Sequence, residues 1–200
     1  MNTINTVKHD NYNYSFTSRN NPIKTFQIAT KLGDITVEEV NYGRDITPRF
    51  IKKLTEFFCR NFGADTIDPF WSKYKTGAPE EKKNLFDMVE KYYTNLFKEE
   101  EKHHNTTLLI AKDKNNRMQG ACLTTPCYEI PGAENSALYI DSVATNKKYR
   151  GFFIAKRMML KTMEAGSRTF SDSFLTAAKE SEGFYEKLGY KKLNKKSPDQ

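Results

Sequence analysis

The sequence predicts an α/β (α+β) protein with a mixed sheet, because strand and helix patterns follow one another in a particular order. Short strand patterns come first, followed by two amphipathic helices and then a hairpin. The last third of the chain alternates strand, helix, strand, helix and strand. A hairpin pairs its strands antiparallel, whereas strands separated by a helix can pair in parallel, so we expect both kinds of pairing.

The composition is that of one folded domain. The chain has 200 residues, of which 38% are hydrophobic and 28% are charged, and a chain of this size can bury a sizeable core. We expect residues 23–200 to form a single domain. Residues 1–22 are rich in Asn, Ser, Thr and Tyr without periodicity, so we expect a flexible or late-packing N-terminal extension there.

Six segments have the composition of strands. Residues 113–116 form a polar turn that should join the third and fourth strands as a hairpin. A further strand should begin near Tyr190, after which only residues 191–200 remain. The six expected strands are residues 26–29, 35–40, 106–112, 118–125, 137–145 and 173–177.

Four segments have apolar residues at helical spacing. Thr47 is the expected N-cap of the first helix, with Pro48 at its first position. Gly166 and Gly189 should end the last two helices. The expected helices begin at Pro48 and near Pro79, and span residues 152–165 and 181–188.

Residues 63–78, between the first two helices, are predicted to form a loop that carries Phe70, Trp71 and Tyr74. Long loops with large apolar side chains are often lids or binding segments. The same aromatic side chains are equally suited to pinning the loop against the core.

Cysteine usage and the lack of long apolar runs predict a cytoplasmic protein. Cys59, Cys122 and Cys127 are odd in number and sparse, as is typical of free thiols in a reducing compartment. The N-terminal residues lack the apolar core of a secretory signal. No His or further Cys is grouped near Cys122 and Cys127, so core packing is favoured over a metal site.

The charge balance favours an anionic partner. Lys and Arg number 32 and Asp and Glu 25, which gives a formal net charge of +7. A phosphorylated ligand, a nucleic acid or a membrane could be this anionic partner. The same excess of positive charge would also be found in a generally lysine-rich soluble protein. Nucleic acid is the least favoured partner, because the sequence lacks the aromatic–basic interleaving of an RNA-binding sheet.

A basic turn follows the strand at residues 137–145. Lys147, Lys148, Arg150 and Lys156 concentrate positive charge at the start of a predicted helix. The unpaired N–H groups of a helix start bind phosphate groups, so this segment suits a ligand with a pyrophosphate. A basic helix start also fits an ordinary solvated surface.

Two motifs here resemble those of the GNAT superfamily of N-acetyltransferases. The cofactor motif Arg/Gln-x-x-Gly-x-Gly/Ala is similar to Arg150-Gly151-Phe152-Phe153-Ile154-Ala155. The later motif Phe-Tyr-x-x-Leu-Gly-Phe/Tyr is similar to Phe184-Tyr185-Glu186-Lys187-Leu188-Gly189-Tyr190. The resemblance is strong over residues 137–193. It implies a largely antiparallel sheet flanked by helices and splayed where acetyl-CoA, or another acyl-CoA, enters, and attack of an acceptor amine on the thioester.

The resemblance also implies roles for individual residues. The strand backbone would bind the pantetheine arm and the following turn the pyrophosphate. Tyr185 would protonate the departing thiolate; a packed aromatic is the alternative. The implied cofactor-binding residues are Val143, Ala144, Thr145, Arg150, Gly151, Phe152, Phe153, Ile154, Ala155 and Lys156.

A general base is needed as well, because amines are protonated at neutral pH. Asp141 is the candidate, and strand alternation places it on one face with Val143 and Thr145. Glu129 and Glu134 in the preceding loop are rivals, and a structural role for Asp141 is an alternative.

The segment between the first two helices commonly lies beside the acceptor in the resembling family. Phe70, Trp71 and Tyr74 are therefore expected to bind the substrate. Asp65 and Asp68 in the same segment would favour a cationic amine, so we expect an amine joined to an apolar body.

Two features depart from the family pattern. Phe153 stands where glycine is usual, and the chain after Tyr190 is too short for the additional strand that the family usually has. Both features favour a catalytically weak acyl-CoA-binding regulatory protein as the alternative function. A basic nucleic-acid-binding module is the second alternative.

Overall fold

The structure, a computed structural model, describes residues 2–5, 23–63, 69–103, 106–127, 137–166, 170 and 172–192. The strands are β1 (Asn2–Asn5), β2 (Phe26–Ile28), β3 (Ile35–Glu39), β4 (Thr107–Lys112), β5 (Met118–Cys127), β6 (Ala137–Thr145), β7 (Ser173–Ala177) and β8 (Lys191–Lys192). The α-helices are α1 (Tyr42–Asp45), α2 (Pro48–Gly63), α3 (Pro69–Thr76), α4 (Pro79–His103), α5 (Ile154–Gly166) and α6 (Glu182–Glu186), with short 3-10 turns η2 (Lys147–Tyr149) and η3 (Lys179–Ser181).

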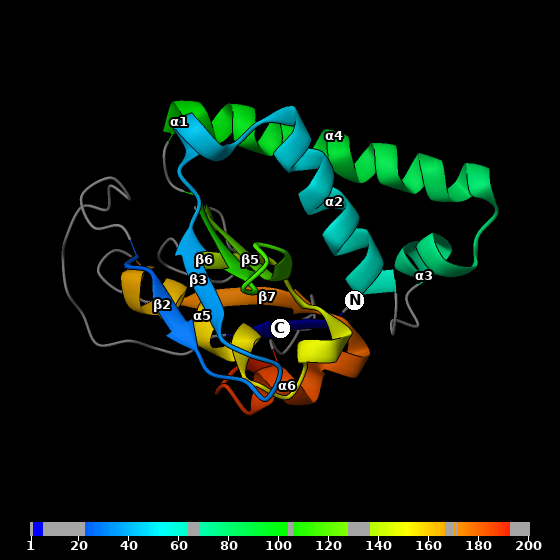
Figure 1. Cartoon of the computed structure of the whole chain (residues 1–200). Coiled ribbons are helices and arrows are strands. Elements are labelled where there is room, and N and C mark those ends of the chain that lie inside the picture. The colour runs from blue at the N-terminus through cyan, green and yellow to red at the C-terminus, as the bar shows by residue number, and fades with distance from the viewer. Residues whose placement is uncertain are drawn as a thin grey trace.

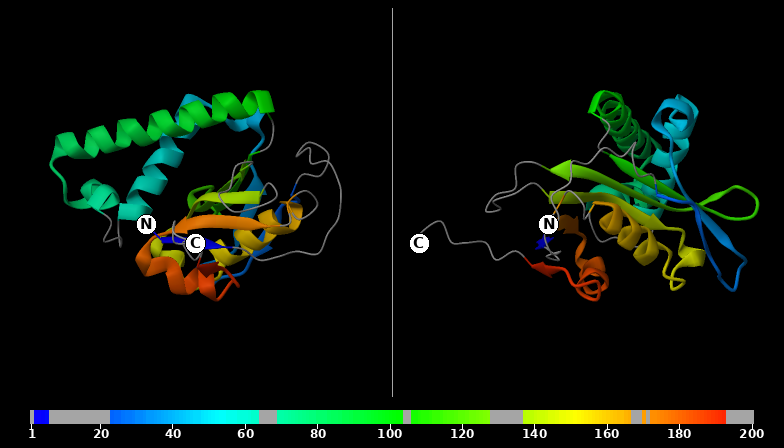
Figure 2. Two further views of the ribbon diagram at one scale, coloured as in Figure 1. Left: turned by 180° about the vertical axis from the view of Figure 1, so that it is seen from behind. Right: turned by 90° about the vertical axis from the view of Figure 1, so that its left-hand side faces the viewer.

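The eight strands form one sheet in the order β2-β3-β4-β5-β6-β7-β1-β8. All neighbouring strands pair antiparallel except β6 and β7, which pair in parallel. Helices α2 and α4 cover one face and α5 covers the other (Figures 1 and 2). These features confirm the predicted α/β (α+β) class with a mixed, largely antiparallel sheet. No helix in the described ranges has the length and apolar character needed to cross a membrane.

Each face of the sheet has its own core. Under α2 and α4, the fully buried Phe58 and Tyr93 stack with ring centroids 5.4 Å apart, against strand residues such as Leu108. Under α5, Met158 and Leu175 belong to a second buried cluster. Helix α2 lies on one face of the sheet and α5 lies on the other. Both helical layers therefore border the end of the sheet that lies between α2 and α5.

The start of α2 follows from its capping residues. Thr47 Oγ1 accepts a hydrogen bond from the N–H of Phe50 at 3.1 Å, and Pro48 is the first helical residue. Proline is suited to this position because its missing N–H would have no partner within the helix. The predicted N-cap and helix start are therefore confirmed.

The prediction of a loop over residues 63–78 is wrong for most of that segment, because residues 69–76 form α3. Pro69 begins this helix, and Trp71 and Tyr74, three residues apart, pack one face of it against the core under α2 and α4. Residues 64–68 lie outside the described part of the chain.

Helix α5 starts at Ile154, two residues later than predicted. Gly151 has φ +85° and Phe153 has φ +60°, both in the left-handed region. Residues with this conformation cannot continue a right-handed helix. Phe152 and Phe153 therefore belong to the turn between η2 and α5.

The N-terminal segment supplies a strand beyond β7. Strand β1 lies between β7 and β8 and pairs antiparallel with both, with Asn2 opposite Ala177 and Ile4 opposite both Leu175 and Lys192 (Figure 1, dark blue). The strand thus occupies the sheet position between β7 and β8. The other residues of the predicted extension, 1 and 6–22, lie outside the described ranges.

We expect Ile4→Pro to lower the free energy of unfolding by roughly 2 kcal/mol, because proline lacks the N–H that a strand paired on both sides needs. Ile4→Val is the matched control, since it keeps the backbone N–H and the β-branched side chain. Urea unfolding measures both. Equal stability of the two variants would contradict the pairing of β1.

Candidate active site

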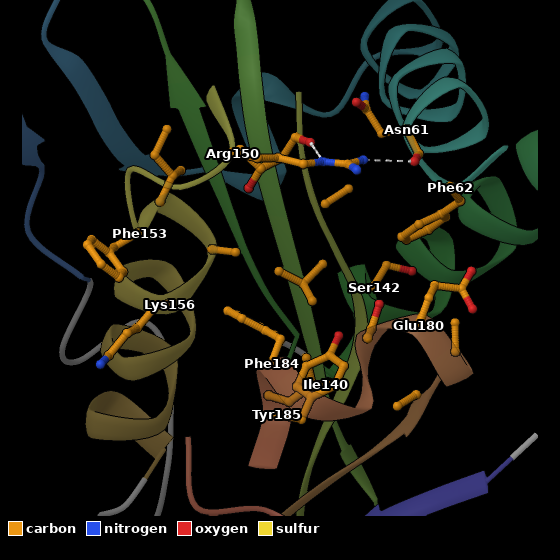
Figure 3. A pocket seen from close by; sticks show the side chains of 18 of the residues that line it. Asn61, Phe62, Ile140, Ser142, Arg150, Phe153, Lys156, Glu180, Phe184 and Tyr185 are labelled. Atoms are coloured by element: carbon orange, nitrogen blue, oxygen red, sulfur yellow. Dashed lines mark hydrogen bonds between the residues drawn. The ribbon is translucent and has the colours of Figure 1, made fainter. Parts of the chain in front are cut away.

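The site begins where β6 and β7 separate. Their parallel pairing runs from Leu138 opposite Ser173 to Ile140 opposite Leu175, and β6 then continues to Thr145 without a β7 partner. A pocket of about 750 Å³ opens in this gap. Its lining comes from β6, the turn between η2 and α5, the end of β7, η3 and α6, together with Asn61, Phe62 and Trp71 from α2 and α3 (Figure 3). This is the splayed cleft that the resemblance implied.

The unpaired side of β6 offers polar groups to the pocket. Val143, Ala144 and Thr145 all line it, as predicted for the residues along the pantetheine arm. The Oγ1 atom of Thr145 is buried and has no hydrogen-bond partner among the described residues. A buried hydroxyl without a partner is costly.

The basic turn forms one end of the pocket. Gly151, Phe153, Ile154, Ala155 and Lys156 line it, so the first turn of α5 faces the cavity. Its N–H groups and the positive end of the helix dipole are suited to an anion. Phe152 is not part of this lining and packs, partly buried, against the core under α5.

Arg150 lines the same pocket and connects two layers of the protein. Its Nε donates to the Thr145 carbonyl at 3.3 Å, and its Nη2 donates to the Asn61 carbonyl at 3.4 Å, near the end of α2 (Figure 3). A cationic group is favourable near a helix C-terminus. The guanidinium therefore fixes the turn to α2 as well as adding charge to the pocket.

Phe153 has a left-handed backbone conformation, which favours glycine. Its φ of +60° is unusual for a residue with a side chain, and the side chain is 67% exposed. Figure 3 shows the ring pointing away from the centre of the pocket. The amides of the turn thus keep their place, at the cost of strain of about 1–2 kcal/mol at this residue.

Phe153→Gly is expected to raise the free energy of unfolding by about 0.5–1 kcal/mol and to leave affinity for CoA equal or better. Glycine removes the left-handed strain, and its greater freedom in the unfolded chain offsets part of the gain. Phe153→Ala is the control, because it removes the ring but keeps the strain. Calorimetry with CoA would contradict this expectation if Phe153→Gly weakened binding more than tenfold, since the ring would then contact the ligand.

Tyr185 of α6 extends into the pocket from the β7 side. It is 9% exposed, and Figure 3 shows its hydroxyl directed into the cavity. Burial raises the pKa of Tyr185, and the neighbouring Cys122, Tyr190 and Tyr139 raise it further. The phenol therefore stays protonated at neutral pH and can donate a proton or a hydrogen bond.

Asp141 is placed by a β-bulge in β6. In the pairing with β5, Leu123 lies opposite Ser142 and the next residue, Thr124, lies opposite Ile140, so Asp141 is an extra residue without a partner. A bulge changes the direction of the side chains around it. The prediction that Asp141 shares a face of the strand with Val143 is therefore wrong. The sequence contains no signal for the bulge.

The Asp141 carboxylate lines the pocket and is held from the α4 side. Oδ1 accepts a hydrogen bond from Ser142 Oγ at 2.7 Å, and Oδ2 accepts one from the Tyr92 hydroxyl. Val143, in contrast, packs against the core under α5. Burial raises the pKa of Asp141, and the two hydroxyl donors only partly oppose that rise. A carboxylate with a raised pKa is a stronger proton acceptor than an exposed one.

The end of the pocket away from Lys156 combines aromatic and acidic groups. Phe62 and Trp71 line it with ring centroids 4.9 Å apart, and Glu180 of η3 extends toward the same region (Figure 3). Tyr74 is not part of the lining and packs against the core under α2 and α4. Sequence reasoning missed Glu180, because nothing in its local pattern relates it to a pocket.

Some candidates lie outside the described residues. These are the side chain of Phe70, together with Asp65, Asp68, Glu129 and Glu134. Cys59 and Cys122 are buried free thiols, and the side chain of Cys127 is not described. Within the described ranges, His, Cys, Asp and Glu side chains form no group of three that could hold a metal ion.

Comparison with known proteins agrees with this geometry. Residues 69–190 match the Acetyltransferase (GNAT) family, which is more than half of the chain. The chain therefore belongs to the GNAT family of acetyltransferases. A search of curated proteins finds no match.

Several solved structures share the fold. A predicted acetyltransferase with acetyl-CoA from Clostridium acetobutylicum is 17% identical, with a TM-score of 0.53 over 80% of this chain and 92% of that one. A GCN5-related N-acetyltransferase from Ralstonia eutropha is 12% identical, with a TM-score of 0.56 over 82% and 96%. PH1933 from Pyrococcus horikoshii is 15% identical, with a TM-score of 0.60 over 82% and 92%. At these identities the likeness is one of fold.

Proposed function

We propose that the protein transfers an acetyl group from acetyl-CoA to the nitrogen of an amine by direct attack on the thioester. The observation that carries the proposal is that Asp141 of β6 and Tyr185 of α6 line one pocket. A proton acceptor and a proton donor are the two groups that amide formation from a thioester needs.

The donor fits along β6 and the basic turn. The pantetheine arm would lie along Val143–Thr145, which line the pocket where β6 has no β7 partner. The pyrophosphate would meet the N-terminus of α5, with Lys156 beside it. Arg150 would support this turn through its bonds to carbonyls, in addition to its charge.

One residue accepts a proton from the amine, and another donates a proton to the leaving thiolate. The bound ammonium group first gives one proton to the Asp141 carboxylate. The neutral amine nitrogen then forms a bond to the acetyl carbon, the carbon–sulfur bond breaks, and the leaving thiolate takes the proton of the Tyr185 hydroxyl. The second proton of the nitrogen passes to the Tyr185 oxygen and restores the hydroxyl. The raised pKa of Asp141 suits its role, because the carboxylate accepts a proton more readily. Tyr185 is protonated before the reaction, as a proton donor must be.

The acceptor would bind between α2, α3 and η3. Phe62 and Trp71 offer aromatic surface, and the carboxylates of Glu180 and Asp141 favour a cationic amine. These groups together support the expectation of an amine joined to an apolar body.

The alternative of a catalytically weak acyl-CoA-binding protein rested on two departures from the family pattern. Phe153 has a glycine-like φ and an exposed ring, and β1 occupies the strand position beyond β7. Neither departure removes a group from the pocket, so we favour an active enzyme.

A mass-spectrometric screen with acetyl-CoA tests the proposal. The amines are 2-phenylethylamine, ethylamine, L-phenylalanine, spermidine and a lysine-containing peptide. We expect acetylation of 2-phenylethylamine above that of ethylamine, which lacks the ring, and of L-phenylalanine, which adds a carboxylate beside the amine. Binding of CoA without acetylation of any amine would support the non-catalytic alternative.

A further inference from the structure

Asp141 is held by a chain of hydroxyl groups that runs from the pocket to α4. Tyr92 donates to Oδ2 of Asp141 and Ser142 donates to Oδ1 at 2.7 Å. The Tyr93 hydroxyl in turn lies 3.0 Å from Ser142 Oγ. Two adjacent tyrosines of one helix thus contact two adjacent residues of β6, which are brought to the same side by the bulge at Asp141.

We propose that Tyr92 is a positioning residue for the acetyl transfer, and that its hydroxyl fixes the Asp141 carboxylate and carries its proton to solvent. This inference rests on the proposed function. It adds a residue to the reaction that belongs to neither GNAT-like motif of this chain and that lies 49 positions from Asp141 in sequence.

The first part of the role follows from the geometry. The bulge leaves Asp141 without a cross-strand neighbour to restrict its side chain. Each carboxylate oxygen has two lone pairs. One on each oxygen is taken by a hydroxyl donor, so the carboxylate is fixed in direction while a lone pair remains free to accept a proton from the amine.

The second part of the role, transfer of the proton to solvent, follows from the exposure of the Tyr92 side chain. Asp141 is partly buried beside the pocket, which the substrates fill during the reaction. Tyr92 is 47% exposed. After Asp141 takes up the proton of the amine, the Tyr92 hydroxyl turns its own proton from Oδ2 toward water. The carboxyl group then passes its proton to the Tyr92 oxygen while the Tyr92 hydroxyl proton passes to water. The carboxylate is then restored without release of the proton into the pocket.

Few other titratable groups surround Asp141. Tyr93 of α4 lies close enough to be influenced by the Asp141 charge, while Tyr139 of β6 acts on Tyr92 and Cys59 of α2 acts on Tyr93. Glu180 of η3 lies across the pocket. Among the described residues no Lys, Arg or His forms an ion pair with Asp141, so its ionisation depends on burial and on the two hydroxyl donors.

The test compares Tyr92→Phe with Tyr93→Phe. Both variants remove one phenolic hydroxyl from α4 and keep the ring, but only Tyr92 bonds Asp141 directly. The pKa of Asp141 is measured by carbon-13 NMR of labelled aspartate, with the signal assigned through Asp141→Asn. The second readout is the pH dependence of kcat/KM for acetylation of 2-phenylethylamine by acetyl-CoA.

We expect Tyr92→Phe to raise the pKa of Asp141 by about 1, because the carboxylate loses a charge-assisted donor. The acid limb of the kcat/KM profile should move upward by the same amount. Tyr93→Phe should move both by less than half as much.

An unchanged Asp141 titration in Tyr92→Phe overturns the proposal, and so does a shifted titration with an unchanged acid limb. If the wild type binds CoA but acetylates no amine of the screen, the proposed function fails and the role in the reaction fails with it, while the titration still decides whether Tyr92 holds the carboxylate.

Discussion

Tyr185→Phe is expected to lower kcat about 10²- to 10⁴-fold while changing the affinity for CoA less than threefold. The variant removes the only phenolic hydroxyl that α6 directs into the pocket and keeps the buried ring. Loss of a general acid typically costs this factor, because the leaving thiolate must depart without a proton. Steady-state kinetics and calorimetry with CoA separate the two effects.

Tyr190→Phe is the matched control for this variant. Tyr190 is also a buried tyrosine, but its hydroxyl bonds Ser173 at 2.9 Å and is not part of the pocket lining. Its removal should lower stability and leave kcat within about threefold. Equal turnover in Tyr185→Phe and Tyr190→Phe would assign Tyr185 to packing.

Asp141→Asn is expected to lower kcat/KM about 10²- to 10⁴-fold and to raise thermal stability at neutral pH. An amide cannot take the proton of the amine. The same change removes a buried charge, because burial raises the pKa of Asp141 and its ionised form is therefore unfavourable in the folded protein. Loss of activity with gain of stability is typical of a strained active-site group.

The stability gain should depend on pH with a definite sign. Because the folded-state pKa of Asp141 is raised, the folded protein binds the proton more tightly than the unfolded chain does. The wild type should match Asp141→Asn below the unfolded-state pKa, about 3.9, and become less stable than it as pH rises through the folded-state pKa.

Asp113→Asn should change the stability of the protein in the opposite direction. Burial opposes its ionisation, but hydrogen bonds from Arg117, Asn115 and Gln119 lower the pKa of Asp113 overall. This variant should lose stability at neutral pH. Melting temperatures from pH 3 to 8 distinguish the two, and a destabilised Asp141→Asn at pH 7 would contradict the account of its burial.

The sequence was most informative where local chemistry decides the structure. Proline and threonine marked the start of α2, and the Arg150 and Tyr185 motifs identified two walls of one pocket. These features depend on neighbours within a few residues, so a single sequence contains them.

The sequence was least informative where partners are distant. The bulge at Asp141 depends on the register of β5, and the bond from Tyr92 depends on how α4 crosses β6. Strand β1 pairs with residues of β7 that lie 169 to 175 positions away. Tyr92 and Tyr93 share the helical pattern of core aromatics, and that pattern says nothing about where their hydroxyl groups point.

Phe153 illustrates a different limit. A phenylalanine before a helix has no sequence signal for a left-handed backbone, so the residue was assigned to the helix itself. Only the resemblance to a glycine position pointed to a special conformation there.

Binding of CoA tests the central claim most directly, because every proposed step requires the donor in the splay between β6 and β7. Calorimetric titration with CoA at moderate salt should give a saturable heat, and CoA should raise the melting temperature. No heat and no thermal shift at millimolar CoA would contradict the account.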